Sequence, residues 1–343
     1  MPSEKLAPET TVATAGEHAL IRHIRARLTP APDWLVVDVG DDAAVYEPQR
    51  NALEVITTDA IVDGVHFDRA FTPPSAIGHR ALAVNLSDLA AMGAEPRLAT
   101  ISMALPQTLT LQHFEEIVDG LLALAERTRI RVVGGNITAT PGPLVVDVTA
   151  VGVVGRRRML TRSGARPGNY IFVSGTLGDA SAGLAQLRAN PLVEGARPSE
   201  LVARYLQPEA RLRLGQQLGR RQAATSAIDL SDGLADGLHQ LAAASGVGLE
   251  IDAAAIPVHE QASSYWRMAN RDALQEAVAG GDDYELLFTV HPRRLGRLKA
   301  VERLIAGLKL TRIGIVTRAL RVDIIHGEGR RQPVSGGYEH FVS

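Results

Sequence analysis

The sequence predicts a two-domain protein, in which an α+β N-terminal domain with a mixed sheet and helices on one side precedes an α/β C-terminal domain. With 343 residues, each half is long enough to bury its own core. The first half contains several short strand-like segments and two long helical ones, an order typical of a sheet with helices on one face. Charges and chain breakers cluster over residues 155–168, so we place the junction there. We expect a disordered tail over 1–15 and domains over 16–155 and 156–343.

Composition excludes several classes of protein. The 36 basic residues are balanced by 38 acidic ones, which gives no reason to expect a nucleic-acid surface. We find no apolar run of membrane-spanning length, and the charged start is unlike a secretory signal. The chain has no cysteine, which rules out disulfides, thiolate zinc sites and cysteine nucleophiles. We therefore expect a cytoplasmic protein with neither nucleic-acid nor membrane partners.

Apolar periodicity indicates the elements of the first half. One strand alternates so regularly, over 144–154, that a single chain would leave a second face of valines open, and we expect a partner subunit to cover it. The elements predicted are helices over 17–28, 75–93 and 111–127 and strands over 53–56, 98–105, 130–133 and 144–154.

The second half opens with a strand over 170–174, a glycine turn over 175–178 and a helix from Asp179. The turn lacks the Gly-Lys-Ser/Thr ending of a P-loop and the dinucleotide Gly-x-Gly-x-x-Gly pattern. Its helix could offer N–H groups to an anion, although a tight strand-to-helix connection is the simpler interpretation. The further elements predicted are a helix over 234–245 and strands over 286–288 and 313–316.

Aspartates occur where apolar segments break. Asp42 stands beside a glycine and Asp59 follows a predicted strand, although an Asp-Asp pair beside Gly is more often a solvated turn. Asp88 lies in a helix that is apolar nearly all round, and burying an ionised carboxylate costs several kcal/mol unless it is paired or binds a metal. An internal cap is the alternative for Asp88. Asp229 and Asp232 stand among apolar residues.

A thiol-free, acid-rich set of side chains suits Mg²⁺ far better than zinc. Mg²⁺ held by few carboxylates usually completes its shell with water and phosphate oxygens. The residues therefore make nucleotide phosphate chemistry our leading hypothesis. Two other side chains stay open at this level: Arg162 either reaches a phosphate or forms a structural salt bridge, and His66 either touches a ligand or is an ordinary surface histidine.

Six segments, in order along the chain, resemble the thiamine-monophosphate kinase family. The resemblance covers most of the chain from residue 17 to 341, and the Asn-Leu-Ser-Asp segment is its most specific part. The wider superfamily includes aminoimidazole ribonucleotide synthetase, and also two enzymes that rely on cysteine or selenocysteine, which this chain lacks. The matching segments are residues 40–43, 57–59, 83–93, 160–165, 228–234 and 281–286.

This resemblance implies an aminoimidazole ribonucleotide synthetase-like fold and transfer of the ATP γ-phosphoryl group onto thiamine monophosphate, giving thiamine diphosphate and ADP. It also implies a homodimer whose N-terminal sheets join into a barrel, with ATP and several Mg²⁺ ions in a groove between domains. The N-terminal domain would bind ATP and Mg²⁺ and dimerise. Because a phosphate monoester has a second pKa of about 6, the acceptor oxygen needs no general base.

The same resemblance assigns residues to three groups. The magnesium ligands would be Asp42, Thr57, Thr58, Asp59, Asp88, Asn136, Asp229 and Asp232. The ATP contacts would be Gly135, Asn136, Arg162 and Ser231. The thiamine phosphate would lie near His66, Asp282 and Ser335.

Three positions depart from the family pattern. Asn136 stands where many members have a metal-binding Asp, Asp282 where Glu is frequent, and Ser335 where an aromatic residue commonly meets the thiamine. These departures bear on affinity and on the number of metal ions more than on the reaction class. The alternatives are another ATP-dependent enzyme of the superfamily, acting on an aminoimidazole phosphate, and a nucleotide-binding protein without turnover.

Overall fold

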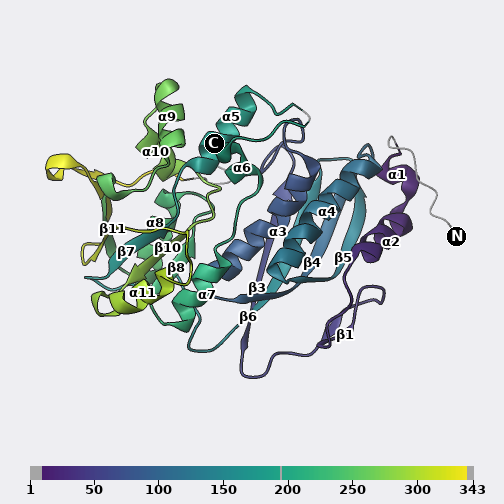
Figure 1. Ribbon diagram of the computed structural model, residues 1–343, viewed down its shortest axis with the longest axis horizontal. Coiled ribbons are helices and arrows are strands. Elements are labelled where there is room, and N and C mark those ends of the chain that lie inside the picture. The colour runs from purple at the N-terminus through teal and green to yellow at the C-terminus, as the bar shows by residue number, and fades with distance from the viewer. Residues whose placement is uncertain (1–9, 194, 338–343) are drawn as a thin grey trace. The chain divides into compact units, whose positions relative to one another are not determined.

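Figure 1 shows the computed structural model, which describes residues 10–193 and 195–337. The chain folds into two compact units. Of the described residues, the N-terminal unit comprises 10–85 and 96–153, and the C-terminal unit comprises 86–95, 154–193 and 195–337. The last turns of one long helix therefore belong to the C-terminal unit, although the sequence around them belongs to the N-terminal one.

The N-terminal unit is built on a four-stranded sheet in the order β3-β6-β4-β5, in which β4 and β5 are parallel. A separate antiparallel pair, β1 and β2, precedes it. Its helices are α1 (Val12–Ala15), α2 (Glu17–Arg27), α3 (Pro74–Ala91) and α4 (Leu111–Thr128). Its strands are β1 (Leu35–Val37), β2 (Val45–Tyr46), β3 (Leu53–Val62), β4 (Glu95–Pro106), β5 (Arg131–Thr140) and β6 (Val145–Val154).

Helices α3 and α4 lie across one face of this sheet (Figure 1). Two glycines let their backbones approach closely: a Cβ on Gly78 would come within 1.8 Å of the Ile117 carbonyl oxygen, and one on Gly120 within 1.9 Å of the Ser75 carbonyl oxygen. The apolar face predicted for α4 is the face that the structure buries, including Phe114. The predicted sheet with helices on one side is confirmed.

The second face of β6 differs from our expectation. The valines at its C-terminal end are covered within the chain, because Val151 is buried in a cluster with Leu35, against which Trp34 and Tyr46 pack. The β1–β2 pair thus supplies apolar cover that strand alternation alone could not reveal. Toward the other end of β6 the same face carries the half-buried polar side chains of Asp147 and Thr149.

Two strands run further than their patterns predicted. β3 continues through residues 57–59 to Val62, and β5 continues through Gly134 and Gly135 to Thr140. Threonine and isoleucine favour extended backbone, which explains the first extension. In the second, the glycine is a site of close approach and not a turn, since a Cβ on Gly135 would lie 2.0 Å from the Ile101 carbonyl oxygen.

The C-terminal unit contains a seven-stranded sheet in the order β13-β12-β9-β11-β7-β10-β8, antiparallel except for the parallel pair β12 and β9. Its strands are β7 (Tyr170–Ser174), β8 (Ser226–Asp229), β9 (Gly248–Asp252), β10 (Leu286–Val290), β11 (Leu310–Thr317), β12 (Val322–Ile325) and β13 (Arg331–Pro333). Its helices are α5 (Asp179–Ala189), α6 (Glu200–Leu206), α7 (Leu212–Arg220), α8 (Leu234–Ser245), α9 (Glu260–Met268), α10 (Ala273–Ala279) and α11 (Leu295–Glu302).

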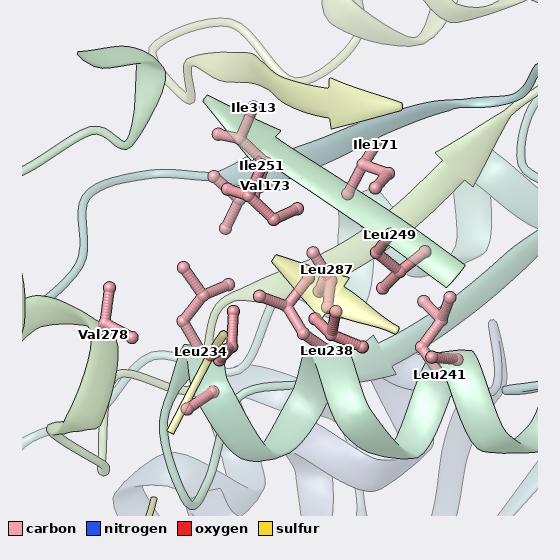
Figure 2. Packing of buried hydrophobic residues seen from close by; sticks show 14 of the residues in the cluster. Ile171, Val173, Leu234, Leu238, Leu241, Leu249, Ile251, Val278, Leu287 and Ile313 are labelled. Atoms are coloured by element: carbon pink, nitrogen blue, oxygen red, sulfur yellow. The ribbon is translucent and has the colours of Figure 1, made fainter. Parts of the chain in front are cut away.

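Both faces of this sheet are buried. Figure 2 shows Leu234, Leu238 and Leu241 of α8 directed at Ile171 and other strand residues on one face. On the opposite face, Phe172 and Phe288 stack with ring centroids 5.7 Å apart, in a cluster with residues of α7, α11 and the end of α3. Alternate residues of β7 therefore serve two cores, and the α/β domain predicted for this half is confirmed. None of the described helices combines the length and apolarity needed to cross a membrane.

Candidate active site

The C-terminal unit joins two predicted site segments that are far apart in the sequence. Asp229 is the last residue of β8, and its side chain is buried. The hydroxyl of Ser87, at 0% exposure near the end of α3, donates a 2.7 Å hydrogen bond to Oδ2 of Asp229. Asp88, the next residue, is half-buried and is close enough for its charge to act on Asp229.

The Asp229 carboxyl group is electrostatically unusual. Burial raises its pKa, and the neighbouring charge of Asp88 raises it further, to about 7, against the opposing effects of the Ser87 hydrogen bond and the Arg162 charge. Two carboxylates in a poorly solvated place repel each other, and a divalent cation between or beside them would relieve that repulsion. The oxygen-only donor set therefore fits a hard cation such as Mg²⁺.

The loop before β10 lies beside the loop after β8. The backbone N–H of Asp282 donates to the Ser231 carbonyl at 2.7 Å, and that of Tyr284 donates to the Leu230 carbonyl at 2.9 Å. The Ser231 hydroxyl donates to Oδ2 of Asp232 at 3.0 Å, and the Tyr284 hydroxyl donates to Oδ1 of Asp282 at 3.0 Å. The structure thus brings Ser231, Asp232 and Asp282 together.

The segment after β13 also lies beside the loop that follows β8. Ser335 is exposed and follows Val334, whose carbonyl lies 3.0 Å from Nε2 of His239 on α8. A Cβ on Gly337 would lie 3.4 Å from the Asp232 carbonyl oxygen. Ser335 is therefore on a segment that passes next to the Asp232 loop. The other predicted nucleotide contact of this unit, Arg162, donates through Nη1 to Oε1 of Gln240.

In the N-terminal unit, Asp42 lies in an exposed turn between β1 and β2. Gly40 adopts a φ of 127°, and the Asp42 N–H donates to Oδ1 of Asp41 at 2.8 Å. Turn geometry and exposure leave the Asp42 carboxylate on the surface of its own unit.

The three predicted ligands in β3 lie within the strand and not after its end. Because side chains alternate along a strand, Thr57 and Asp59 point to one face and Thr58 to the other. The Thr58 hydroxyl donates to Oδ1 of Asp147 on β6 at 3.1 Å and accepts from Thr149 at 3.1 Å. The structure therefore separates the Thr58 side chain from those of Thr57 and Asp59.

Gly135 and Asn136 lie mid-strand in β5, where Asn136 is exposed and is in register with Ser102. β3 and β5 are the opposite edges of the sheet, with β6 and β4 between them. Within one chain, the Asp59 and Asn136 strands are therefore three strand spacings apart, about 14 Å. His66 uses Nδ1 to accept the Val62 N–H at 3.1 Å within its own turn.

Among residues 10–193 and 195–337, no group of three or more His, Asp or Glu side chains converges closely enough to hold a metal ion. The C-terminal unit contributes the Asp88–Asp229 pair, and the N-terminal unit contributes single carboxylates. The sequence alone did not indicate two hydrogen-bonding partners of the site residues, Ser87 and Asp147. Ser87 lies inside the motif that suggested Asp88, and Asp147 is a lone carboxylate in an otherwise apolar strand, a signal that could have indicated it.

Comparison with known proteins identifies the family of both halves of the chain. Residues 40–154 match the AIR synthase related protein, N-terminal domain, and residues 166–326 match the corresponding C-terminal domain. Thiamine-monophosphate kinase from Escherichia coli O157:H7 is 38% identical over 334 residues, covering 96% of this chain and 99% of the relative.

Two solved structures are similar over nearly their whole length. The thiamine-monophosphate kinase from Stenotrophomonas maltophilia K279a superimposes with a TM-score of 0.81 at 38% identity, covering 92% of this chain and 98% of that one. AaThiL complexed with AMPPCP and TMP superimposes with a TM-score of 0.75 at 33% identity, covering 95% and 97%. The resemblance seen in the sequence motifs is confirmed: the chain belongs to the thiamine-monophosphate kinase family of AIR synthase related proteins.

Proposed function

We propose that the protein transfers the γ-phosphoryl group of ATP onto thiamine monophosphate, forming thiamine diphosphate and ADP. The pair formed by half-buried Asp88 and buried Asp229 carries the proposal, because two mutually repelling carboxylates beside Ser231 and Arg162 are suited to metal-bound phosphate. The relatives named above support the choice of reaction, and AaThiL supports the two substrates, since it holds an ATP analogue together with TMP.

In this reaction an oxygen of the acceptor phosphate attacks the γ-phosphorus, and the bond from that phosphorus to the β,γ-bridging oxygen breaks, so that ADP leaves. Mg²⁺, when bound, neutralises the phosphate charges and polarises the reacting phosphoryl group. The acceptor is already deprotonated near neutral pH, so the chain has no proton to remove. Its own residues bind and orient two anionic partners.

We assign the binding roles as follows. Asp42, Asp59, Asp88, Asp229 and Asp232 hold divalent cations, with oxygens of Thr57, Thr58 and Asn136 as further donors. Ser87 keeps the Asp229 carboxylate oriented through its hydrogen bond. Arg162, Ser231 and Gly135 contact ATP, and His66, Asp282 and the segment at Ser335 contact the thiamine phosphate. In the Thr58 assignment the main-chain oxygen is the donor, because the Thr58 hydroxyl is engaged with Asp147.

The protein acts as a homodimer in this proposal. β3 and β5 are both edge strands, and exposed sheet edges in native proteins are normally paired or protected. Ile56 on β3 is 73% exposed. Pairing of N-terminal sheets from two copies would cover these edges and bury Ile56. The cytoplasm, where ATP and Mg²⁺ are available, is the proposed location.

The test is a coupled ADP-release assay with ATP, Mg²⁺ and either thiamine monophosphate or formylglycinamidine ribonucleotide, with thiamine diphosphate identified by mass. We expect ADP release and thiamine diphosphate with the first acceptor only, and loss of both with EDTA. Turnover with the second acceptor would assign the chain to the aminoimidazole branch instead. Tight ATP–Mg²⁺ binding without turnover on either acceptor would identify a binding protein.

A further inference from the structure

A cavity lies within the C-terminal unit and involves none of the proposed site residues. Its volume is about 740 Å³, within the range of small-molecule pockets. It opens among the turn after β7, helix α6, the segment preceding α7, and the loops before α9 and β11. Among the side chains that line it are Asp179, Arg204, Arg211, Arg213, His259 and Lys309.

The floor of this cavity holds two arginines that share one buried carboxylate. Glu285, at 0% exposure, accepts hydrogen bonds from Arg204 at 2.6 Å, from Nε of Arg211 at 2.7 Å, and from the Ser174 hydroxyl. Arg211 also donates through Nη2 to the same carboxylate. Two guanidinium groups therefore share one buried carboxylate, while Arg204 also lies 3.8 Å from Asp179 and Arg211 lies 3.2 Å from Glu209.

Two buried polar atoms at the cavity have no hydrogen-bond partner within the described parts of the chain: Oδ1 of Asp179 and Nδ1 of His259. Asp179 is only 4% exposed, and its Oδ2 is engaged with the Thr176 hydroxyl at 2.5 Å and with Arg204 at 3.8 Å. A buried polar atom without a partner costs about 1–3 kcal/mol. A ligand group that hydrogen-bonds Oδ1 would remove that cost.

The rim holds one arginine and one lysine at the surface. Lys309 and Arg213 are exposed, and neither forms an ion pair with any residue in the described part of the chain. The rim also carries two carboxylates: Glu209 pairs with Arg211 at 3.2 Å, and Glu200 lies 3.9 Å from the His259 imidazole. The cations without partners are therefore available to a ligand.

We propose that this cavity is a binding site for a small organic anion that carries a phosphate or carboxylate group together with an amino or hydroxyl donor. The anionic group faces Lys309 and Arg213 on the rim. The donor hydrogen-bonds Oδ1 of Asp179. A metal cation is a poor match, because arginines and a lysine surround the single available carboxylate oxygen.

Four small molecules test separately whether the cavity recognises the anionic group and the hydrogen-bond donor. O-Phosphoserine and glycerol 3-phosphate have both an anion and a donor, succinate has only anions, and ethanolamine has a donor but no anion. Isothermal titration and ligand-observed NMR on the full chain should show the first two binding about tenfold more tightly than the last two, the value of one charge-assisted hydrogen bond. Equal binding of all four, or none at a concentration on the order of 10 mM, would overturn the proposal.

Variants then locate the site, which is necessary because the proposed kinase substrate is itself an organic phosphate. Lys309→Glu should weaken O-phosphoserine binding about tenfold. Lys299→Glu is the matched control, an exposed lysine on α11 that does not line the cavity, and should leave binding unchanged. Asp179→Asn should reduce the preference for donor-bearing probes. If Lys309→Glu and Lys299→Glu bind O-phosphoserine equally, the cavity is not the binding site, even should Asp179→Asn fail to fold.

Discussion

The Ser87 hydroxyl donates a 2.7 Å hydrogen bond to Oδ2 of Asp229, across 142 residues of sequence. Both side chains are buried, so the bond is shielded from water and orients the carboxylate that ends β8. The same contact holds Asp88 near Asp229, where the charge of Asp88 raises the Asp229 pKa. This contact positions the carboxylates of the candidate metal site in the C-terminal unit.

Replacing Ser87 by alanine should destabilise the protein. The variant leaves Asp229 buried with one fewer donor, which costs about 1–3 kcal/mol in the free energy of unfolding. Urea unfolding followed by tryptophan fluorescence measures this. Ser264→Ala, which removes a hydroxyl from an exposed hydrogen bond, should cost less than about 0.5 kcal/mol. Equal unfolding midpoints for the two variants would show that the Ser87 contact contributes nothing.

Removing a proposed metal ligand should reduce catalysis while leaving the fold near intact. Asp42→Asn, Asp59→Asn and Asp88→Asn are each expected to lower kcat at least about a hundredfold, equivalent to about 3 kcal/mol of lost charge stabilisation. The exposed Asp33, which has no proposed role, supplies the control Asp33→Asn. The measurement is ADP release at saturating Mg²⁺. Near-normal turnover in all three variants would remove these residues from the metal assignment.

Glu285 should make stability depend on acid pH. Burial by itself would raise the pKa of Glu285, but the hydrogen bond and charge of Arg211, with the charge of Arg204, lower it below its usual value of 4.5. A depressed pKa contributes stability above the unfolded-state value, and that stability is lost as pH falls through it toward the folded-state value. The protein should therefore lose unfolding free energy as pH falls below about 4.5.

Glu285→Gln should test that linkage. The variant leaves two arginines against a neutral amide, which we expect to cost about 3–5 kcal/mol at neutral pH, and it should lose less additional stability on acidification. Urea midpoints at about pH 7 and about pH 4 give both quantities. Glu302→Gln, at an exposed position of α11, is the control. A variant with the same acid sensitivity as the parent protein would contradict the role given to Glu285.

The dimer should depend on the exposed edge of the N-terminal sheet. Sedimentation velocity at micromolar concentration is expected to show a dimer, and Ile56→Asp should shift the population toward monomer because it places a charge in the covered edge. Leu320→Asp changes another exposed apolar residue, 80% exposed compared with 73% for Ile56, and should leave the dimer intact. A parent protein that sediments only as a monomer refutes the assembly.

An aromatic ring at residue 335 should improve acceptor binding. A cation over an aromatic face is worth about 0.5–2 kcal/mol, so Ser335→Trp should lower the KM for thiamine monophosphate several-fold and leave the KM for ATP unchanged. Gln332→Trp, at an exposed position of β13, controls for a nonspecific effect of the indole. If both KM values change equally in Ser335→Trp, this segment does not contact the thiamine.

Much of the fold could be predicted because its signals are local. The apolar stripe of α4, the alternation of β6 and the turn between β7 and α5 each follow from neighbouring residues, and the structure has them where the sequence indicated. The ends of β3 and β5 could not be predicted, since Thr57–Thr58 and Gly134–Gly135 are compatible with either a turn or an extended strand. Cross-strand pairing, a long-range interaction, decided both.

The sequence by itself determined which residue types are available for chemistry: aspartates without cysteine, in motifs whose order identifies the family. Only the tertiary structure decided which of them meet. It buried Ser87 against Asp229, set Asp282 beside Ser231, and turned Thr58 toward Asp147 and away from the face of Asp59. These contacts depend on strand register and on which helix face is buried, and both are set by packing between segments far apart in the chain.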